Sequence, residues 1–289
     1  MDRSKYCGCK GIRTCLQCEE KYGLKENQNL ITNAIKSFPT YVYCIFCDKV
    51  FAGQNADEYL HHPNHRENGY QKVSGVYVFP EFITDDEEKQ LIDDLDAMPW
   101  DISQSGRRKQ NFGPNCNFKK RKLKPGAFKG FPSVTEFIQK RFNEVPLLKG
   151  YRTIEQCSLE YDPHRGASID PHIDDCWIWG ERIVTVNLLS DTVLILTKYK
   201  GDKSRYNLQL APNIDTDPDD IAIRIPMPRK SLVILCGDAR YNWEHCILRE
   251  DIQKRRVCLA YREFTPDYLP GGKNAIESEM ILKLAENFW

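Results

Sequence analysis

The stretch Ser168-Ile169-Asp170-Pro171-His172-Ile173-Asp174 places a histidine and an aspartate one residue apart. In a β-strand, residues i and i+2 point to the same face, so the imidazole of His172 and the carboxylate of Asp174 converge on one point. Asp175 is a rival carboxylate, but it would lie on the opposite face of a regular strand. The stretch therefore predicts two ligands of a metal ion.

A third ligand is available downstream. Among the six histidines, His245 lies far along the chain in the apolar, strand-like segment Tyr241-Asn242-Trp243-Glu244-His245-Cys246. Two histidines and one carboxylate form a facial triad with open coordination positions, which is typical of non-haem Fe(II) enzymes. We therefore expect His172, Asp174 and His245 to bind iron.

Two arginines follow His245 in Arg256-Val257-Cys258-Leu259-Ala260-Tyr261-Arg262. On a strand, Arg256 and Arg262 share one face. A guanidinium presented from a strand is a permanently charged, bidentate clamp for a carboxylate such as that of a 2-oxoacid. Arg255 is an alternative clamp, but Arg256 is favoured because it shares a face with Arg262.

Together these motifs resemble the iron and 2-oxoglutarate signature of the AlkB-type dioxygenases. Further similar stretches are Gln104–Gly113, Pro228–Leu232 and Gly237–Tyr241. The resemblance implies a double-stranded β-helix (a cupin-like jelly roll) that uses Fe(II), 2-oxoglutarate and oxygen. It also implies that Arg256 and Tyr161 anchor the distal carboxylate of 2-oxoglutarate, with Arg262 near its metal-bound end.

Three positions depart from the family pattern. Cys258 and Ala260 stand where the family often has Asn and Thr, and Leu159 stands where it often has Asn. Each change removes a polar side chain that could contact the cosubstrate. We expect the affinity and pose of 2-oxoglutarate to depend on the arginines and Tyr161 instead.

The length of 289 residues predicts one catalytic domain and a small N-terminal appendage, with residues 1–74 and 75–289 as the two parts. Basic and acidic residues balance at 41 each, which argues against a surface devoted to nucleic acid. There is no apolar run of roughly 18 residues, and the polar, cysteine-rich start is unlike a signal peptide. We expect an intracellular protein, cytoplasmic and nuclear, with no membrane partner.

The pattern after residue 75 predicts an α+β fold with flanking helices. Thr84-x-x-Glu87 is a capping box ahead of one helix, and a second helix is expected from Ser133. Alternating β-branched segments predict strands over 181–189, 192–198, 220–225, 231–236 and 256–264. Short strands of this kind suggest a jelly-roll core over about residues 151–265, followed by a helix over about 274–287.

Residues 1–74 contain two clusters of metal-ligand residues. Four thiolates, enough for a closed zinc site, come from Cys7, Cys9, Cys15 and Cys18. A Cys2His2 zinc finger is suggested by Cys44, Cys47, His61 and His65, with His62 as a competing ligand. The alternative is that these are free cysteines in a flexible arm. Either zinc site would be structural.

A basic stretch precedes the iron motif. Between Ser105 and Lys124 there are eight basic and no acidic residues, namely Arg107, Arg108, Lys109, Lys119, Lys120, Arg121, Lys122 and Lys124. The family resemblance implies that residues of about 103–130 form a lid over the substrate, contacted by Arg107, Arg108, Lys109 and Phe112. The stretch could instead bind phosphates, act in nuclear import or be a solvated loop. Trp177 and Trp179 either line the pocket or pack in the core.

The reaction implied by the resemblance is oxidative removal of an N-methyl group with release of formaldehyde. The N-terminal cysteines and Trp177-x-Trp179 resemble a branch of the family associated with monomethyl-lysine in actin and with N6-methyladenine in DNA. A methylated protein such as actin is therefore the first expected partner, and nucleic acid is the alternative. Two other classes stay open, a non-catalytic zinc-dependent binding module and a zinc hydrolase with a metal-bound water.

Overall fold

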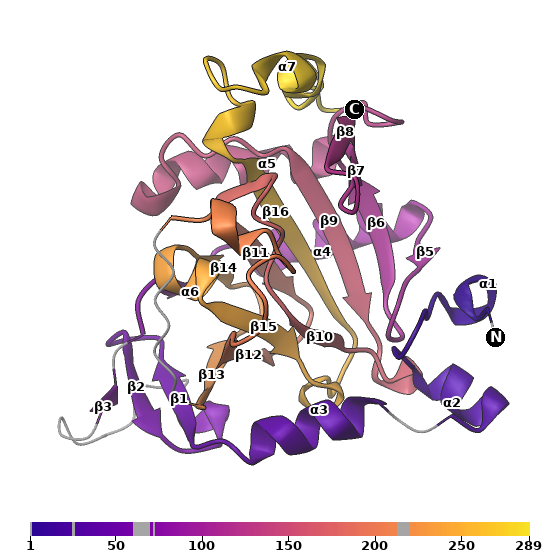
Figure 1. Ribbon diagram of the computed structural model, residues 1–289, viewed down its shortest axis with the longest axis vertical. Coiled ribbons are helices and arrows are strands. Elements are labelled where there is room, and N and C mark those ends of the chain that lie inside the picture. Colours follow the sequence, from indigo (N-terminus) through magenta and orange to yellow (C-terminus); the bar gives the residue numbers. More distant parts are fainter. Residues whose placement is uncertain (1, 25–26, 60–69, 72, 213–219) are drawn as a thin grey trace.

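The described residues form two seven-stranded β-sheets and one two-stranded sheet, with helices around them (Figure 1). The structure is a computed structural model and describes residues 2–24, 27–59, 70–71, 73–212 and 220–289. Within these ranges, no helix has the length and apolar character needed to cross a lipid bilayer. The mixture of helices and mainly antiparallel sheets is the α+β class that the sequence predicts.

The first sheet carries two of the histidines of interest. In spatial order its strands are β10 (Ile169–His172), β15 (Trp243–Ile247), β12 (Thr192–Lys198), β13 (Ala222–Met227), β1 (Thr40–Cys44), β2 (Lys49–Ala52) and β3 (Tyr70–Gln71). The pairing of β1 with β13 is parallel and the other pairings are antiparallel. Strands from the N-terminal segment thus extend this sheet, and the boundary expected at residue 74 does not separate them from it.

The second sheet carries the arginines. In spatial order its strands are β4 (Val76–Phe79), β14 (Leu232–Leu235), β11 (Trp179–Leu188), β16 (Arg256–Phe264), β9 (Glu155–Tyr161), β6 (Arg108–Phe112) and β5 (Asp101–Ile102). All of these pairings are antiparallel. The register sets Arg256 opposite Tyr161 and Cys258 opposite Leu159, so the residues expected to contact the cosubstrate are neighbours.

Apolar side chains fill the space between the sheets. Ile183, Val233 and Leu235 of the second sheet share one core with Leu194 and Ile225 of the first. Each such aliphatic side chain contributes roughly 2 kcal/mol when it is fully buried. The polar residues of the site interrupt this core, so the site lies between the sheets.

Helices cover the outer face of the second sheet. The capping box predicted for α4 (Asp85–Ala97) is present, since Thr84 Oγ1 accepts from the Glu87 amide at 3.2 Å and the Glu87 carboxylate accepts from the Thr84 amide at 2.9 Å. Leu91 and Leu95 of α4 pack with Ile138 of α5 (Glu136–Arg141) against this face. The helix expected from Ser133 begins as the 3-10 turn η2 (Ser133–Thr135), and the α-helix itself starts at Glu136.

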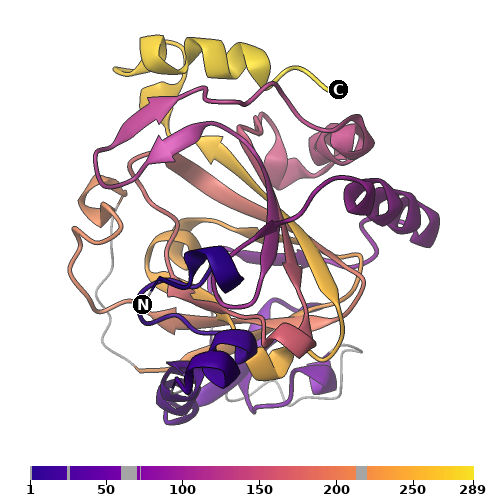
Figure 2. The ribbon, with the colours of Figure 1, turned by 90° about the vertical axis from the view of Figure 1, so that its right-hand side faces the viewer.

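Five further α-helices and a β-hairpin are present among the described residues. They are α1 (Ser4–Cys7), α2 (Leu16–Tyr22), α3 (Asn27–Lys36), the hairpin β7 (Asn115–Asn117) and β8 (Lys122–Lys124), α6 (Gly237–Tyr241) and α7 (Ala275–Leu284). Of these, α3 packs through Ile35 on the outer face of the first sheet. Figure 2 shows α1 and α2, in indigo, in front of the sheets, and α7, in yellow, at the far end of the molecule. The C-terminal helix is therefore present, but it ends earlier than the predicted residue 287.

Candidate active site

Two antiparallel strands and one loop bring the three predicted iron ligands together. His172 is the last residue of β10 and lies opposite His245 of β15, with ring centroids 4.3 Å apart. The sequence suggested that Asp174 lies on the same strand as His172, but this is wrong. Strand β10 ends at His172, and Asp174 lies in the loop that follows. One ligand atom from each of the three residues lies within 4.8 Å of the other two. Asp175 turns elsewhere, since its carboxylate accepts from Asn207 Nδ2 at 2.7 Å.

The electrostatics of the three residues suit a divalent cation. Burial lowers the pKa of His172, and burial together with the nearby His172 lowers the pKa of His245 to about 3, so both rings are neutral at pH 7. His172 Nδ1 donates to the Asp170 carbonyl oxygen at 2.9 Å, which leaves Nε2 with its lone pair. Burial raises the pKa of Asp174, but Arg262 and the two histidines outweigh it and hold this pKa well below its usual range. Two neutral nitrogens and one carboxylate are a ligand set for Fe(II).

Arg262 holds the carboxylate ligand in place. Its Nε donates to Asp174 Oδ1 at 2.7 Å, and its Nη1 donates to Glu155 Oε2 at 2.6 Å. Burial lowers the pKa of Arg262, but the carboxylates of Asp174 and Glu155 raise it further, so the net shift is upward. Within the described residues, Asp174 Oδ2 is buried without a hydrogen-bond partner, which leaves it for a metal ion.

Arg256 lies deep in the cavity between the two sheets that His172, Asp174 and His245 also line. Its side chain is 1% exposed, its Nε donates to Asn187 Oδ1 at 2.6 Å, and its guanidinium carbon lies 4.7 Å from the centroid of the Tyr161 ring. In the part of the chain that the structure describes, Arg256 Nη1 is buried and has no hydrogen-bond partner. A buried cation with an unpaired donor fits a carboxylate, since leaving such a group unpaired is costly.

The rival Arg255 points out of the cavity. Its guanidinium binds Asp96 at 2.7 Å and Glu160 at 2.8 Å. Leu159, Cys258 and Ala260, where the chain departs from the family pattern, do line the cavity. Arg256 and Tyr161 line the same cavity and offer polar groups there.

Sequence reasoning missed Asn187 and Glu155. Asn187 is fully buried on strand β11, and its Nδ2 donates to the carbonyl oxygens of Met227 at 2.9 Å and Pro228 at 3.0 Å. These bonds fix the amide that accepts from Arg256. The signal available in the sequence was an asparagine directly after the β-branched run Ile183-Val184-Thr185-Val186.

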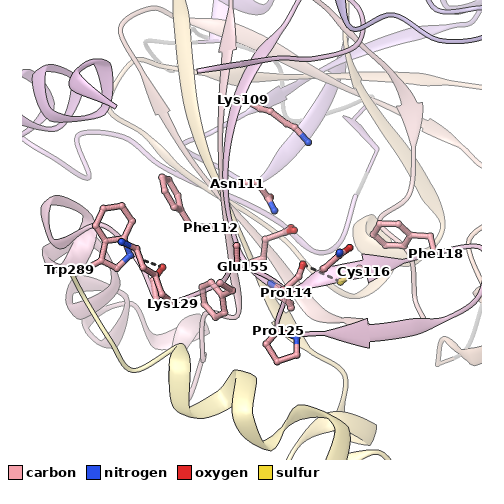
Figure 3. Close-up of a pocket in the computed structure, with 16 residues that line it drawn as sticks. Lys109, Asn111, Phe112, Pro114, Cys116, Phe118, Pro125, Lys129, Glu155 and Trp289 are labelled. Atoms are coloured by element: carbon pink, nitrogen blue, oxygen red, sulfur yellow. Dashed lines mark hydrogen bonds between the residues drawn. The ribbon is translucent and has the colours of Figure 1, made fainter. Parts of the chain in front are cut away.

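The predicted lid residues fall into two groups. Arg107 lines a cavity of about 240 Å³ next to His172, and Lys109 and Phe112 line a larger cleft of about 590 Å³ (Figure 3). Arg108 is different, because its guanidinium binds the carboxylate of Glu160 at 2.5 Å on the other face of the sheet. This ion pair engages Arg108 in the fold, so the expected substrate contact does not agree with its position.

We call the larger cleft the lid cleft. It lies between β6, the β7–β8 hairpin and the C-terminus, and Figure 3 shows the aromatic rings of Phe112, Phe118 and Trp289 around it, with Glu155 among them. The Lys129 ammonium lies 3.7 Å from the centroid of the Trp289 ring, so this aromatic surface already holds one lysine cation.

The two tryptophans that follow the iron motif are core residues. Trp177 and Trp179 are 4% and 2% exposed. Trp177 packs edge-on against Phe118 of the lid, with ring centroids 6.3 Å apart, and Trp179 lies 5.8 Å from the Arg262 guanidinium. Both side chains belong to the core between the two sheets.

The first cysteine cluster is assembled and the second is only partly described. The sulfur atoms of Cys7, Cys9, Cys15 and Cys18 all lie within 4.8 Å of one another, and all four side chains are buried. Cys44 ends β1 and Cys47 lies in the turn that leads to β2. His61, His62 and His65 lie outside the described residues, so the zinc finger stays a prediction.

This combination of a facial triad and a buried arginine is the site of a 2-oxoglutarate-dependent dioxygenase, and the chain belongs to the AlkB family of these enzymes. It is 37% identical to the "Alpha-ketoglutarate-dependent dioxygenase alkB homolog 4" of Homo sapiens, over 98% of this chain and 94% of the human protein. The mouse protein of the same name is 35% identical over the same shares of the two chains. No protein-family model matches the chain.

A third relative has a different name. The chain is 29% identical to a "DNA N6-methyl adenine demethylase" of Caenorhabditis elegans, over 92% of this chain and 89% of the worm protein. The family resemblance is thus confirmed, and the chain is an enzyme. The non-catalytic binding module and the zinc hydrolase are therefore set aside.

Proposed function

We propose that the enzyme removes N-methyl groups oxidatively, with Fe(II) on His172, Asp174 and His245 and with 2-oxoglutarate held by Arg256. Two buried groups that lack partners among the described residues carry this proposal: Asp174 Oδ2 fits a metal ion, and Arg256 Nη1 fits a carboxylate. Both line one cavity between the two sheets. We take the paired sheets to be the jelly roll implied by the family.

The iron and 2-oxoglutarate supply the oxidising chemistry when they are bound. The chain supplies position and exclusion of water. Arg262 holds Asp174, the Asp170 carbonyl oxygen orients His172, and Asn187 orients Arg256. The Tyr161 phenol lies beside Arg256, and burial raises its pKa, so it stays protonated and can donate a hydrogen bond.

For the substrate, we propose a monomethyl-lysine in a protein such as actin. The lid cleft supports this choice because it combines a carboxylate with aromatic walls, the surroundings that favour an alkylammonium group. Glu155 in this cleft is separated from the iron ligand Asp174 by the single guanidinium of Arg262. The Lys129 ammonium on Trp289 is an example of such a contact within the chain.

N6-methyladenine in DNA is the second candidate. The name of the worm relative supports it. The β7–β8 hairpin also presents an exposed basic surface, made of Lys119, Lys120, Arg121, Lys122 and Lys124. Such a surface binds phosphates in a salt-dependent way. We propose the cytoplasm and nucleus as the compartments, which suit either substrate.

The test is a paired product assay. Protein purified without oxygen receives Fe(II), 2-oxoglutarate and oxygen together with a monomethyl-lysine actin peptide or a DNA strand containing N6-methyladenine, each beside its unmethylated counterpart. Equal yields of formaldehyde and succinate with the peptide support the first substrate, and the same result with DNA supports the second. The His172→Ala variant should release neither product. Asp175→Asn is the matched control, because it keeps His172, Asp174 and His245, and it should release both products. Succinate without formaldehyde from both substrates rejects both.

We also propose that Cys7, Cys9, Cys15 and Cys18 bind one structural zinc ion. The four buried sulfurs are close enough for one tetrahedral site, and thiolates are preferred zinc ligands. A segment of this size has too small a core to fold alone, so the metal would supply the missing stability.

A further inference from the structure

The cysteine module, which we define as residues 2–24, docks directly against the lid and the iron-binding strand. Gly8 has φ 78° and approaches the lid so closely that a Cβ there would lie 2.6 Å from the Ser103 carbonyl oxygen. The Ser105 amide donates to the Cys9 sulfur. On the other side, both guanidinium Nη atoms of Arg249 bind the carboxylate of Glu19 at 3.0 Å.

The loop between Cys9 and Cys15 reaches the rim of the active site. Its residue Arg13 lines the cavity of about 240 Å³ that also contains His172 and Arg107. The Arg13 Nε atom lies 3.2 Å from Asp170 Oδ2. Arg3 fixes the loop to the cysteine cluster. Its guanidinium donates to the Gly11 carbonyl oxygen and, at 3.7 Å, to the Cys18 sulfur.

Asp170 connects this ion pair to the iron ligand. Its side chain binds Arg13, and its backbone carbonyl oxygen accepts from His172 Nδ1 at 2.9 Å. A carbonyl that binds the second ring nitrogen of a metal-bound histidine sets the tautomer and the orientation of that ring. Arg13 therefore acts on the residue that orients His172.

We propose that Arg13 is a positioning residue for the iron ligand His172, and that the metal-held loop of the cysteine module thereby braces the iron site. The proposal rests on iron binding by His172, Asp174 and His245. The N-terminal cysteines would then support the reaction by holding the loop that carries Arg13, in addition to stabilising their own segment. Loss of the module's metal would release the loop, the Arg13–Asp170 pair and the Cys9–Ser105 contact together.

The expected effect is moderate. Loss of a group that binds a metal ligand directly costs about 10- to 100-fold in metal affinity. Arg13 acts one residue further away, and its side chain is 44% exposed, so its ion pair is partly screened by solvent. We therefore expect Arg13→Ala to weaken Fe(II) binding about 3- to 10-fold, below the range for a direct partner.

The experiment is an anaerobic Fe(II) titration of the 289-residue protein, supplied with zinc, in the presence of 2-oxoglutarate. It follows the charge-transfer absorption that Fe(II) gains when a 2-oxoacid chelates it. Arg13→Ala should bind Fe(II) more weakly and alter the band, and Arg13→Lys should restore part of both. Lys10→Ala is the matched control, because it removes an exposed positive charge from the same loop and should leave the titration unchanged.

A double-mutant cycle separates this role from general destabilisation. Asp170→Asn alone should weaken Fe(II) binding as Arg13→Ala does, and adding Arg13→Ala to it should cost little more, because the two residues act as one pair. Additive losses, or wild-type affinity in Arg13→Ala, would overturn the proposal. Zinc content is measured on each sample. If the chain holds no zinc and Arg13→Ala still weakens Fe(II) binding, the positioning role of Arg13 stands and the metal-held loop is rejected. If the wild type binds no Fe(II), both the proposed function and this inference are rejected.

Discussion

Arg262 Nε donates to Oδ1 of Asp174 at 2.7 Å, while Oδ2 of the same carboxylate has no hydrogen-bond partner among the described residues. The guanidinium thus occupies one oxygen and leaves the other for the metal. Asp174 would therefore bind the proposed metal ion through Oδ2, and Arg262 ties the direction of the carboxylate to β16. It also keeps the carboxylate ionised, because Arg262 lowers its pKa against the opposing effect of burial.

Arg262→Lys should weaken iron binding. Lysine cannot bridge Asp174 and Glu155 with the fixed fork of a guanidinium, so the carboxylate ligand loses its orientation. We expect a loss of about 10-fold or more in Fe(II) affinity, as for other partners of metal ligands. Calorimetric titration with Fe(II) without oxygen measures it. Arg255→Lys is the control, because Arg255 directly precedes the same strand and pairs with Asp96 and Glu160 outside the cavity. An equal loss in both variants would contradict the assignment.

Arg256→Lys should weaken the use of 2-oxoglutarate while the metal stays bound. The guanidinium is buried, and its unpaired Nη1 is the group offered to a carboxylate. We expect the KM for 2-oxoglutarate to rise about 10- to 100-fold, as the loss of a charged hydrogen bond worth roughly 1.5–3 kcal/mol predicts. Succinate formation over a range of 2-oxoglutarate concentrations measures it. An unchanged KM would show that the carboxylate binds elsewhere.

Glu160→Gln should destabilise the fold in a pH-dependent way. Burial raises the pKa of Glu160, but Arg108, Arg165 and Arg255 outweigh this and lower it from 4.5 to about 2. A depressed carboxyl pKa stabilises the folded state above pH 4.5, and this contribution is lost as the pH falls towards 2. At pH 7 the shift corresponds to roughly 3 kcal/mol.

Urea unfolding of the two proteins at pH 7, 4 and 3 tests this prediction. The difference in unfolding free energy should shrink as the pH falls from about 4.5. Glu144→Gln, at an exposed position of the chain, should behave like the wild type at every pH. A difference that does not change with pH would point to lost packing instead of lost charge.

Cys18→Ser should remove zinc and loosen the N-terminus. Three thiolates bind zinc less tightly than four, and the segment has little core of its own. We expect the zinc content to fall well below one ion per chain and the amides of residues 103–107 to exchange hydrogen faster, because the lid contacts Gly8 and Cys9. Cys236→Ser, a cysteine outside both clusters, is the control. Full zinc content in Cys18→Ser would argue against this ligand set.

Local patterns in the sequence predicted the elements that carry the site. The strands expected over 192–198 and 256–264 occur at those residues as β12 and β16. The capping box fixed the start of α4. The spacing of Arg256 and Arg262 set both on the inner face, because strand periodicity depends only on neighbouring residues.

The partners of these residues could not be predicted in this way. Arg256 meets Asn187 from 69 positions away, and Arg262 meets Glu155 from 107 positions away. Such pairs follow from the order and register of the strands, which short-range patterns do not contain. The pairing of β1 with β13 was missed for the same reason, since the first 74 residues show little periodicity of their own.

That parallel pairing has a practical consequence for truncated proteins. Thr40, Tyr41 and Val42 cover one side of Ala222, Ile223 and Arg224. A recombinant fragment starting at residue 75 would leave the backbone amides and carbonyls of β13 open along an apolar strand, and such an edge promotes aggregation. An insoluble short fragment would therefore say nothing about catalysis, and activity assays require the N-terminal strands.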